Sequence, residues 1–143
     1  MIVNKVEVDP CSRKVYIATK GRGIWEAPLP DFVEQEMTVS SSQTWDDVKT
    51  FNGHITISSG ATLTLTGTLY MGRNGGITIQ PGGKLRIDGG HITAGHCSDW
   101  WGGISVTGNP NQPQNYSSQG VIEIVNGTIS HARDAITTCG PGS

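Results

Sequence analysis

The 143-residue sequence predicts an all-β fold. Its 20 glycines and 7 prolines are spread along the whole chain, and a helix interior loses about 1 kcal/mol for each glycine and about 3 kcal/mol for each proline relative to alanine. No window has the apolar spacing of an amphipathic helix. Short runs instead alternate apolar and polar residues, as half-buried strands do. These runs are Ile55–Ile57, Leu63–Leu65, Ile77–Ile79, Leu85–Ile87, Ile104–Val106 and Ile122–Ile124.

An internal repeat of 22 residues organises these strands. Ile55 aligns with Ile77, and Leu63 aligns with Leu85. Each repeat contains three short strands, and the chain returns each strand to lie beside its counterpart in the previous copy. A hairpin meander cannot do this. Stacked copies therefore predict three parallel sheets around one apolar interior. The expected fold is a short right-handed single-stranded parallel β-helix of about three coils, in which each fully buried Ile, Leu or Val contributes about 1.5–3 kcal/mol.

The third copy of the repeat begins at Ile104 and carries an insertion. Residues 109–119 contain two prolines and many Asn, Gln and Ser residues, which predicts an exposed loop. Ile136 would open a fourth coil. Arg86 and Glu123 occupy equivalent outward positions and are expected to form a surface pair worth under ~1 kcal/mol. A β-sandwich in which the spacing is incidental is the alternative.

A separate segment, residues 1–29, precedes the repeat and is expected to form a three-stranded antiparallel sheet. Turns rich in Pro, Gly and Ser separate its strands, which are expected at Ile2–Val8, Lys14–Thr19 and Gly23–Ala27. Prolines on both sides of Leu29 interrupt strand pairing because proline lacks the ladder N–H. A linker is therefore expected at 30–43 and a truncated β-helix at 44–139, with 140–143 as a tail or a tag remnant.

The repeat region, from about residue 44 to 138, resembles right-handed parallel β-helix proteins of the pectate-lyase-like superfamily. It is closest in style to β-helix regions of large secreted or surface proteins of Bacteroidetes-type bacteria. The resemblance implies the fold and leaves the activity open. The segments that carry it are Gly53–Leu69, Gly76–Thr93, Trp101–Asn109 and Gly120–Ile136.

The N-terminal segment has a resemblance of its own. Lys14–Glu26, with the upstream Val6–Pro10, is similar to the final strands of a sialidase-like β-propeller blade. The Asp-box pattern of such repeats (Ser-x-Asp-x-Gly-x-Thr-Trp) is absent. The two resemblances together imply the end of a propeller followed by the start of a β-helix.

Hydrolases and lyases of the pectate-lyase-like superfamily act through acidic groups, often with Ca²⁺ or a basic residue, on an external strand face. That resemblance implies a set of candidates in this chain, although no convergent catalytic set is visible among them. Paired carboxylates for glycoside hydrolysis must lie about 5–9.5 Å apart, and nothing in the sequence brings two of them together. The candidates are Asp88, His91, His96, Asp99, His131, Arg133 and Asp134.

The most interesting candidate is Asp99 beside Trp100 and Trp101, because aromatic rings stack on sugar faces. Each candidate also has a structural explanation. The two tryptophan rings are consistent with covering the coil, and Asp88 is consistent with the Asp of an Asp-Gly turn. The run from His131 to Asp134 is consistent with a solvated face. We predict no catalytic residue, metal ligand or cofactor. The predicted ligand-binding residues are Trp100, Trp101, Asp99, His131, Arg133 and Asp134.

Composition narrows the expected partners. A net charge of −2 gives no electrostatic reason to expect nucleic acid, and no apolar stretch approaches the ~20 residues of a membrane span. The expected location is secreted or at the cell surface, with the export signal outside this sequence. The three cysteines leave at least one unpaired; Cys97 and Cys139 are candidates for a bridge between coils.

The leading functional hypothesis is a non-catalytic structural or carbohydrate-binding segment of a larger extracellular bacterial protein. The alternatives are part of a polysaccharide lyase or glycoside hydrolase with an incomplete active site, and a surface adhesin or stalk. Trp45 is expected to cap the first coil. Open coil ends or the N-terminal strands are expected to cause self-association, because unpaired strand edges invite it.

Overall fold

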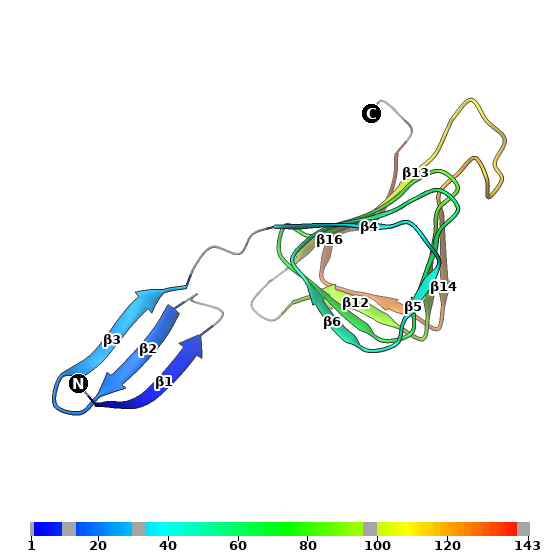
Figure 1. Ribbon diagram of the computed structural model, residues 1–143. Helices are drawn as coiled ribbons and strands as arrows, with labels where there is room; N and C mark the ends of the chain where they lie inside the picture. Colours follow the sequence, from blue (N-terminus) through cyan, green and yellow to red (C-terminus); the bar gives the residue numbers. More distant parts are fainter. Residues whose placement is uncertain (1, 10–13, 30–33, 96–99, 140–143) are drawn as a thin grey trace. The chain divides into compact units, whose positions relative to one another are not determined.

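The computed structural model of the chain describes residues 2–9, 14–29, 34–95 and 100–139. It divides into two compact units, Met1–Val33 and Glu34–Ser143, each with its own strands (Figure 1). The all-β class is confirmed, since the described segments contain strands and no helix. None of them therefore supplies a helix long and apolar enough to cross a membrane.

The first unit is a three-stranded antiparallel sheet in the order β1-β2-β3. This part of the prediction is confirmed, and the bounds of β2 agree with it. Trp25, on β3, is 58% exposed. The strands are β1 (Val3–Asp9), β2 (Lys14–Thr19) and β3 (Gly23–Pro28).

The second unit contains three parallel sheets, and successive strands visit them in turn. From β7 onward each strand therefore lies beside the strand three places before it, and the three sheets surround one interior (Figure 1). Sheet 1 consists of β4 (Gln35–Val39), β7 (Gly53–Ile57), β10 (Gly76–Ile79), β13 (Trp101–Thr107) and β16 (Ala132–Cys139). Sheet 2 consists of β5 (Gln43–Trp45), β8 (Thr62–Leu65), β11 (Lys84–Asp88) and β14 (Val121–Val125). Sheet 3 consists of β6 (Val48–Phe51), β9 (Thr68–Met71), β12 (His91–Ala94) and β15 (Thr128–Ile129).

The register between strands follows the 22-residue repeat. Ile55 pairs with Ile77 in sheet 1, and Leu63 pairs with Leu85 in sheet 2. The pairing continues across the insertion, because β11 of one copy pairs with β14 of the next. These parallel ladders do not fit the β-sandwich alternative, whose sheets are antiparallel.

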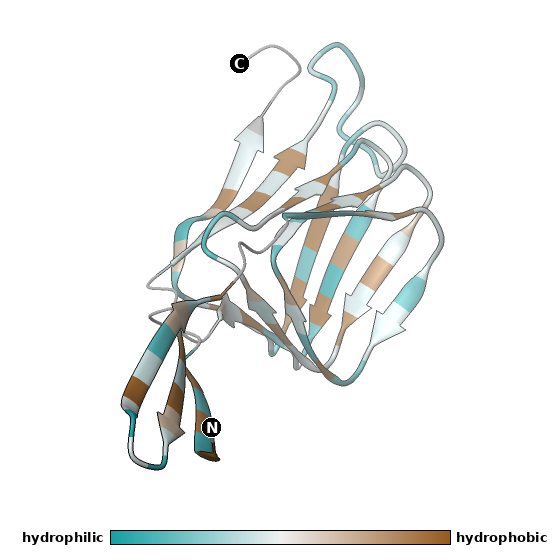
Figure 2. Cartoon of the chain, turned by 60° about the vertical axis from the view of Figure 1, so that its left-hand side comes forward, coloured by the Kyte–Doolittle hydropathy of each residue, from teal (hydrophilic) through white to brown (hydrophobic). Residues whose placement is uncertain are grey.

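Side chains alternate between the interior and the outer faces of the sheets, as the strand period requires. Ile55, Ile57, Ile77 and Ile79 are fully buried, whereas the residues between them are partly exposed. Figure 2 shows the same alternation as apolar and polar bands along the strands of this unit. The buried residues form one continuous apolar cluster, which hydrophobic burial stabilises.

The insertion forms the predicted exposed loop, with residues 110–117 at the surface. The side chain of Gln119 holds its two ends together. Its Oε1 accepts the Asn109 backbone N–H at 2.9 Å, and its Nε2 donates to the Asn109 carbonyl at 2.9 Å.

The predicted linker at 30–43 differs from the structure in its second half. Gln35–Val39 forms β4, which pairs in parallel with β7, and Gln43 begins β5. β4 has one neighbouring strand and buries only Val39. Its sequence is therefore mainly polar, and this polar composition suggested a linker. The predicted Cys97–Cys139 bridge and the 140–143 tail fall on residues 97 and 140–143, outside the described part of the chain.

A test of the close approach between β13 and β16 is the replacement of Gly103 by alanine. Gly103 has φ +104°, and an added Cβ would lie 1.7 Å from the Asp134 carbonyl oxygen. We expect Gly103→Ala to lower the free energy of unfolding by clearly more than the ~1–2 kcal/mol that a positive φ alone costs an alanine, measured by urea denaturation.

Gly89 supplies the matched control. It has φ +72° but nothing within 4 Å of an added Cβ, so Gly89→Ala is expected to cost only the backbone strain, about 1–2 kcal/mol. Equal losses in the two variants would contradict the steric explanation.

Candidate functional site

The predicted ligand-binding residues that the structure describes gather where the chain passes from sheet 3 to sheet 1. Trp100 and Trp101 follow β12, and His131 follows β15. The Trp101 backbone N–H donates to the His131 carbonyl at 2.9 Å, and Trp101 pairs with Ala132 in the parallel register. Two connections about 30 residues apart in sequence thus lie side by side, because the stacked copies are in register.

The two adjacent tryptophans have different roles. Trp101 is fully buried in the apolar cluster, and its indole N–H donates to the Ser130 carbonyl at 2.9 Å. A buried ring cannot stack on a ligand, so Trp101 stabilises the corner from inside and is not a contact residue. Trp100 is 43% exposed and remains available.

Trp100 has a cationic neighbour that the sequence did not reveal. The Arg73 guanidinium lies 5.1 Å from the centroid of its ring, within the range of a cation–π interaction. Arg73 belongs to the turn between β9 and β10, one copy of the repeat earlier. No motif marks Arg73, because the contact depends on how the turns of successive copies stack.

A chain of hydrogen-bonding groups lies beside the tryptophans, on the outer face of sheet 3. His91 Nε2 lies 2.7 Å from Ser130 Oγ, and Ser130 Oγ donates to Thr93 Oγ1 at 2.9 Å. His131 Nδ1 completes the chain, 3.1 Å from Thr93 Oγ1 and 3.2 Å from Ser130 Oγ. Both histidines are among the candidates expected from the sequence, whereas the two hydroxyl residues that link them, Thr93 and Ser130, are not.

The remaining predicted residues contribute less to this corner. Arg133 Nε donates to Asp134 Oδ2 at 3.2 Å, and both side chains are well exposed. Such a surface pair between neighbours is worth little. Asp99 and His96 lie outside the described residues.

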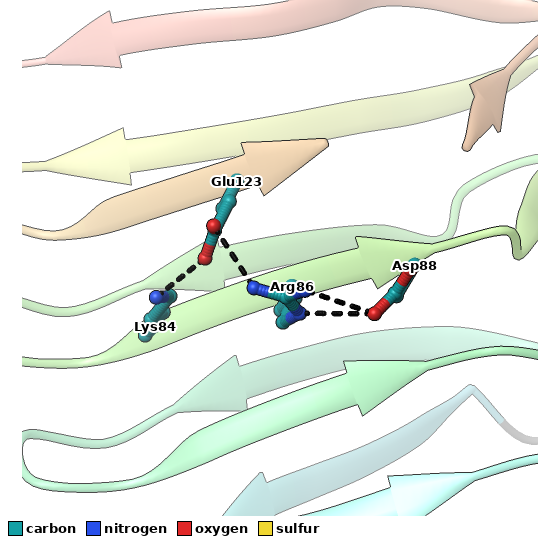
Figure 3. Close-up of polar contacts among 4 residues, drawn as sticks. All are labelled: Lys84, Arg86, Asp88 and Glu123. Atoms are coloured by element: carbon teal, nitrogen blue, oxygen red, sulfur yellow. Dashed lines mark hydrogen bonds and ion pairs between the residues drawn. The ribbon is translucent and has the colours of Figure 1, made fainter. Parts of the chain in front are cut away.

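Asp88 lies elsewhere, in a cluster of four charges on the outer face of sheet 2 (Figure 3). Arg86 lies between its partners, 2.9 Å from Asp88 Oδ2 and 2.9 Å from Glu123 Oε1. Lys84 Nζ lies 2.6 Å from the other Glu123 oxygen. The predicted Arg86–Glu123 pair is confirmed. Two cations and two carboxylates balance one another, and each charged side chain has a partner of opposite sign within the cluster.

The ionisation of the cluster follows from these contacts. The hydrogen bond from Lys84 and the charge of Arg86 together lower the pKa of Glu123, against a smaller opposing effect of burial. Hydrogen bonding to Asp88, with the charge of Glu123, raises the pKa of Arg86. Both charged forms are therefore favoured in the folded chain.

The start of the sheet stack has a hollow of about 590 Å³. Trp45 and Phe51 contribute to its lining, and each is 7% exposed. Trp45 lies within β5, paired with Leu65, and so belongs to the first layer of the apolar cluster. The self-association expected at this end stays a prediction.

The arrangement at the corner suits recognition of a polar ligand. Trp100 offers an exposed apolar ring, and the Arg73 guanidinium beside it offers hydrogen-bond donors. No family model, curated protein or solved structure matches the chain. Across the described residues, no group of three or more His, Cys, Asp and Glu side chains is placed to hold a metal ion.

The lowered pKa of Glu123 predicts a pH dependence of stability. Its carboxylate stabilises the folded state above the unfolded-state pKa of about 4.3, and this contribution is lost as the pH falls through the lower folded-state pKa. We expect Glu123→Gln to be less stable than the wild type near pH ~7 and the difference to shrink toward pH ~3. Urea denaturation at the two pH values measures it.

The control for that experiment is Asp47→Asn, which removes a carboxylate from an exposed pair with Lys49. It is expected to have a smaller effect near neutral pH, because exposed pairs are screened by solvent. A stability difference for Glu123→Gln that is unchanged between the two pH values would contradict the assignment.

His131 provides a second test, because its φ is 53° and few residues other than glycine adopt that conformation readily. In His131→Gly, relief of strain of about 1–2 kcal/mol offsets the loss of a hydrogen bond worth about 0.5–1.5 kcal/mol. We expect its free energy of unfolding to stay within ~1 kcal/mol of the wild type. His131→Val is expected to be destabilised by about 2 kcal/mol or more. A glycine variant less stable than the valine variant in urea denaturation would show the strain argument to be wrong.

Proposed function

We propose that the second unit is a short right-handed parallel β-helix that serves as a non-catalytic, carbohydrate-binding structural segment of a larger extracellular bacterial protein. The proposal of a β-helix is supported by the order in which successive strands visit the three parallel sheets. It is also supported by the single apolar cluster that they enclose. The antiparallel sheet of the first unit is consistent with the proposed end of a propeller blade.

The observation that carries the binding proposal is the exposed ring of Trp100 at the corner between sheets 3 and 1. Sugars present apolar C–H faces and a rim of hydroxyl groups, so a site for them combines an aromatic ring with planar hydrogen-bonding groups. The Arg73 guanidinium and the His131 imidazole are such groups, and both come from connections at this corner.

The positions of the carboxylates favour binding without catalysis. A glycosidase needs two carboxyl groups about 5–9.5 Å apart. Asp88 lies on sheet 2, where Arg86 holds it, whereas Asp134 lies on β16 of sheet 1 beside Arg133. The two carboxylates thus lie on different sheets, each paired with an arginine.

Glycan binding tests this function. We expect the chain to bind a subset of polysaccharides on a glycan array. Trp100→Ala is expected to weaken that binding about tenfold or more in calorimetry, because an aromatic ring that becomes buried on binding contributes much of the affinity. Trp25→Ala is the matched control: Trp25 is 58% exposed, but it lies in the first unit.

Three outcomes would overturn the proposal. The first is the absence of binding to every glycan, which would favour a stalk or adhesin. The second is equal weakening by the two tryptophan variants. The third is the appearance of shortened or unsaturated sugar products, which would favour the lyase or hydrolase alternative.

A further inference from the structure

Two imidazole nitrogens converge on one hydroxyl group on the outer face of sheet 3. His91 Nε2 lies 2.7 Å from Ser130 Oγ, and His131 Nδ1 lies 3.2 Å from the same atom. The two histidines come from different copies of the repeat: His91 begins β12, and His131 is the second residue after the end of β15. Ser130 Oγ is therefore within hydrogen-bonding distance of one ring nitrogen from each histidine.

The surrounding backbone holds this arrangement. The Ser130 N–H donates to the Ile92 carbonyl at 2.9 Å, and the Ser130 carbonyl accepts the buried Trp101 indole N–H at 2.9 Å. The His131 carbonyl accepts the Trp101 backbone N–H at 2.9 Å. Ligands positioned in this way by a rigid sheet lose little conformational freedom when they bind an ion.

The backbone of His131 is a second, independent observation. It has φ 53°, a conformation that glycine adopts at no cost. The other non-glycine residue with positive φ among the described residues is Asn126, in an Asn-Gly turn where asparagine is well tolerated. Strained positions of this kind cluster at functional sites, and here the imidazole meets the hydroxyl groups of Thr93 and Ser130.

We propose that His91 and His131 form a binding site for a divalent transition-metal ion. Imidazole nitrogens suit Cu²⁺, Ni²⁺ and Zn²⁺, whereas Ca²⁺ and Mg²⁺ prefer oxygen ligands. An ion about 2.0–2.1 Å from each nitrogen takes the place of the Ser130 hydroxyl, whose side chain rotates away. Two imidazoles leave further coordination positions for water, since no third His, Cys, Asp or Glu in the described part of the chain completes a cluster.

The test is titration of the full chain, free of any histidine tag, with CuCl₂, NiCl₂ and ZnCl₂ in calorimetry. We expect one ion per chain, with Cu²⁺ bound most tightly. His91→Ala and His131→Gly are each expected to weaken binding about tenfold or more. The glycine variant suits the backbone at residue 131, so its loss of binding is not a loss of the fold.

His54→Ala is the matched control. His54 Nε2 also lies 2.7 Å from a hydroxyl oxygen, that of Thr78, but none of the other histidines that the structure describes contacts that hydroxyl. This variant is expected to bind as the wild type does. Electron paramagnetic resonance of the Cu²⁺ form is expected to show two coordinated nitrogens, and one in each single variant.

Several results would overturn the proposal: absence of binding, unchanged affinity in His91→Ala and His131→Gly, an equal loss in His54→Ala, or tighter binding of Ca²⁺ than of Cu²⁺. The site does not depend on the proposed sugar binding. Trp100→Ala tests the sugar surface and is expected to leave the metal affinity unchanged, so the two proposals fail separately.

Discussion

In-register parallel hydrogen bonding between successive copies of the repeat is the interaction on which the second unit depends. It pairs Ile55 with Ile77, Ile77 with Ile104 and Ile104 with Ile136, so that apolar side chains of successive copies lie one above another. A shift of one residue in any strand would turn its buried residues to the outside. The register and the apolar interior therefore stabilise each other.

The same register determines the outer faces. On sheet 2 it brings Glu123 beside Arg86, where four charges balance one another. At the corner between sheets 3 and 1 it brings Ser130 beside Thr93, and Arg73 beneath the ring of Trp100. One physical arrangement thus produces a self-neutralised face and a surface that combines an aromatic ring, a guanidinium and two imidazoles.

Trp101 couples the interior to this surface. Its ring belongs to the apolar cluster, while its two N–H groups donate to the carbonyls of Ser130 and His131. The backbone that carries His131 in its strained conformation is therefore attached to the most buried part of the unit. The proposed sugar surface and the proposed metal site share this support and the His131 imidazole, whereas Trp100 and Arg73 belong only to the first and His91 only to the second.

The sequence alone determined the all-β class, the 22-residue offset of the parallel pairs and the outward Arg86–Glu123 contact, because period-2 alternation and turn residues are local signals. The tertiary structure decided the rest. The pattern of apolar and polar residues does not identify the mainly polar Gln35–Val39 as a strand, because this segment becomes a strand by pairing with β7. Nor does composition tell a buried Trp101 from an exposed Trp100. The contact of His91 with Ser130 joins residues 39 positions apart, and that of Thr93 with His131 joins residues 38 positions apart, so only the stacking of whole copies brings them together.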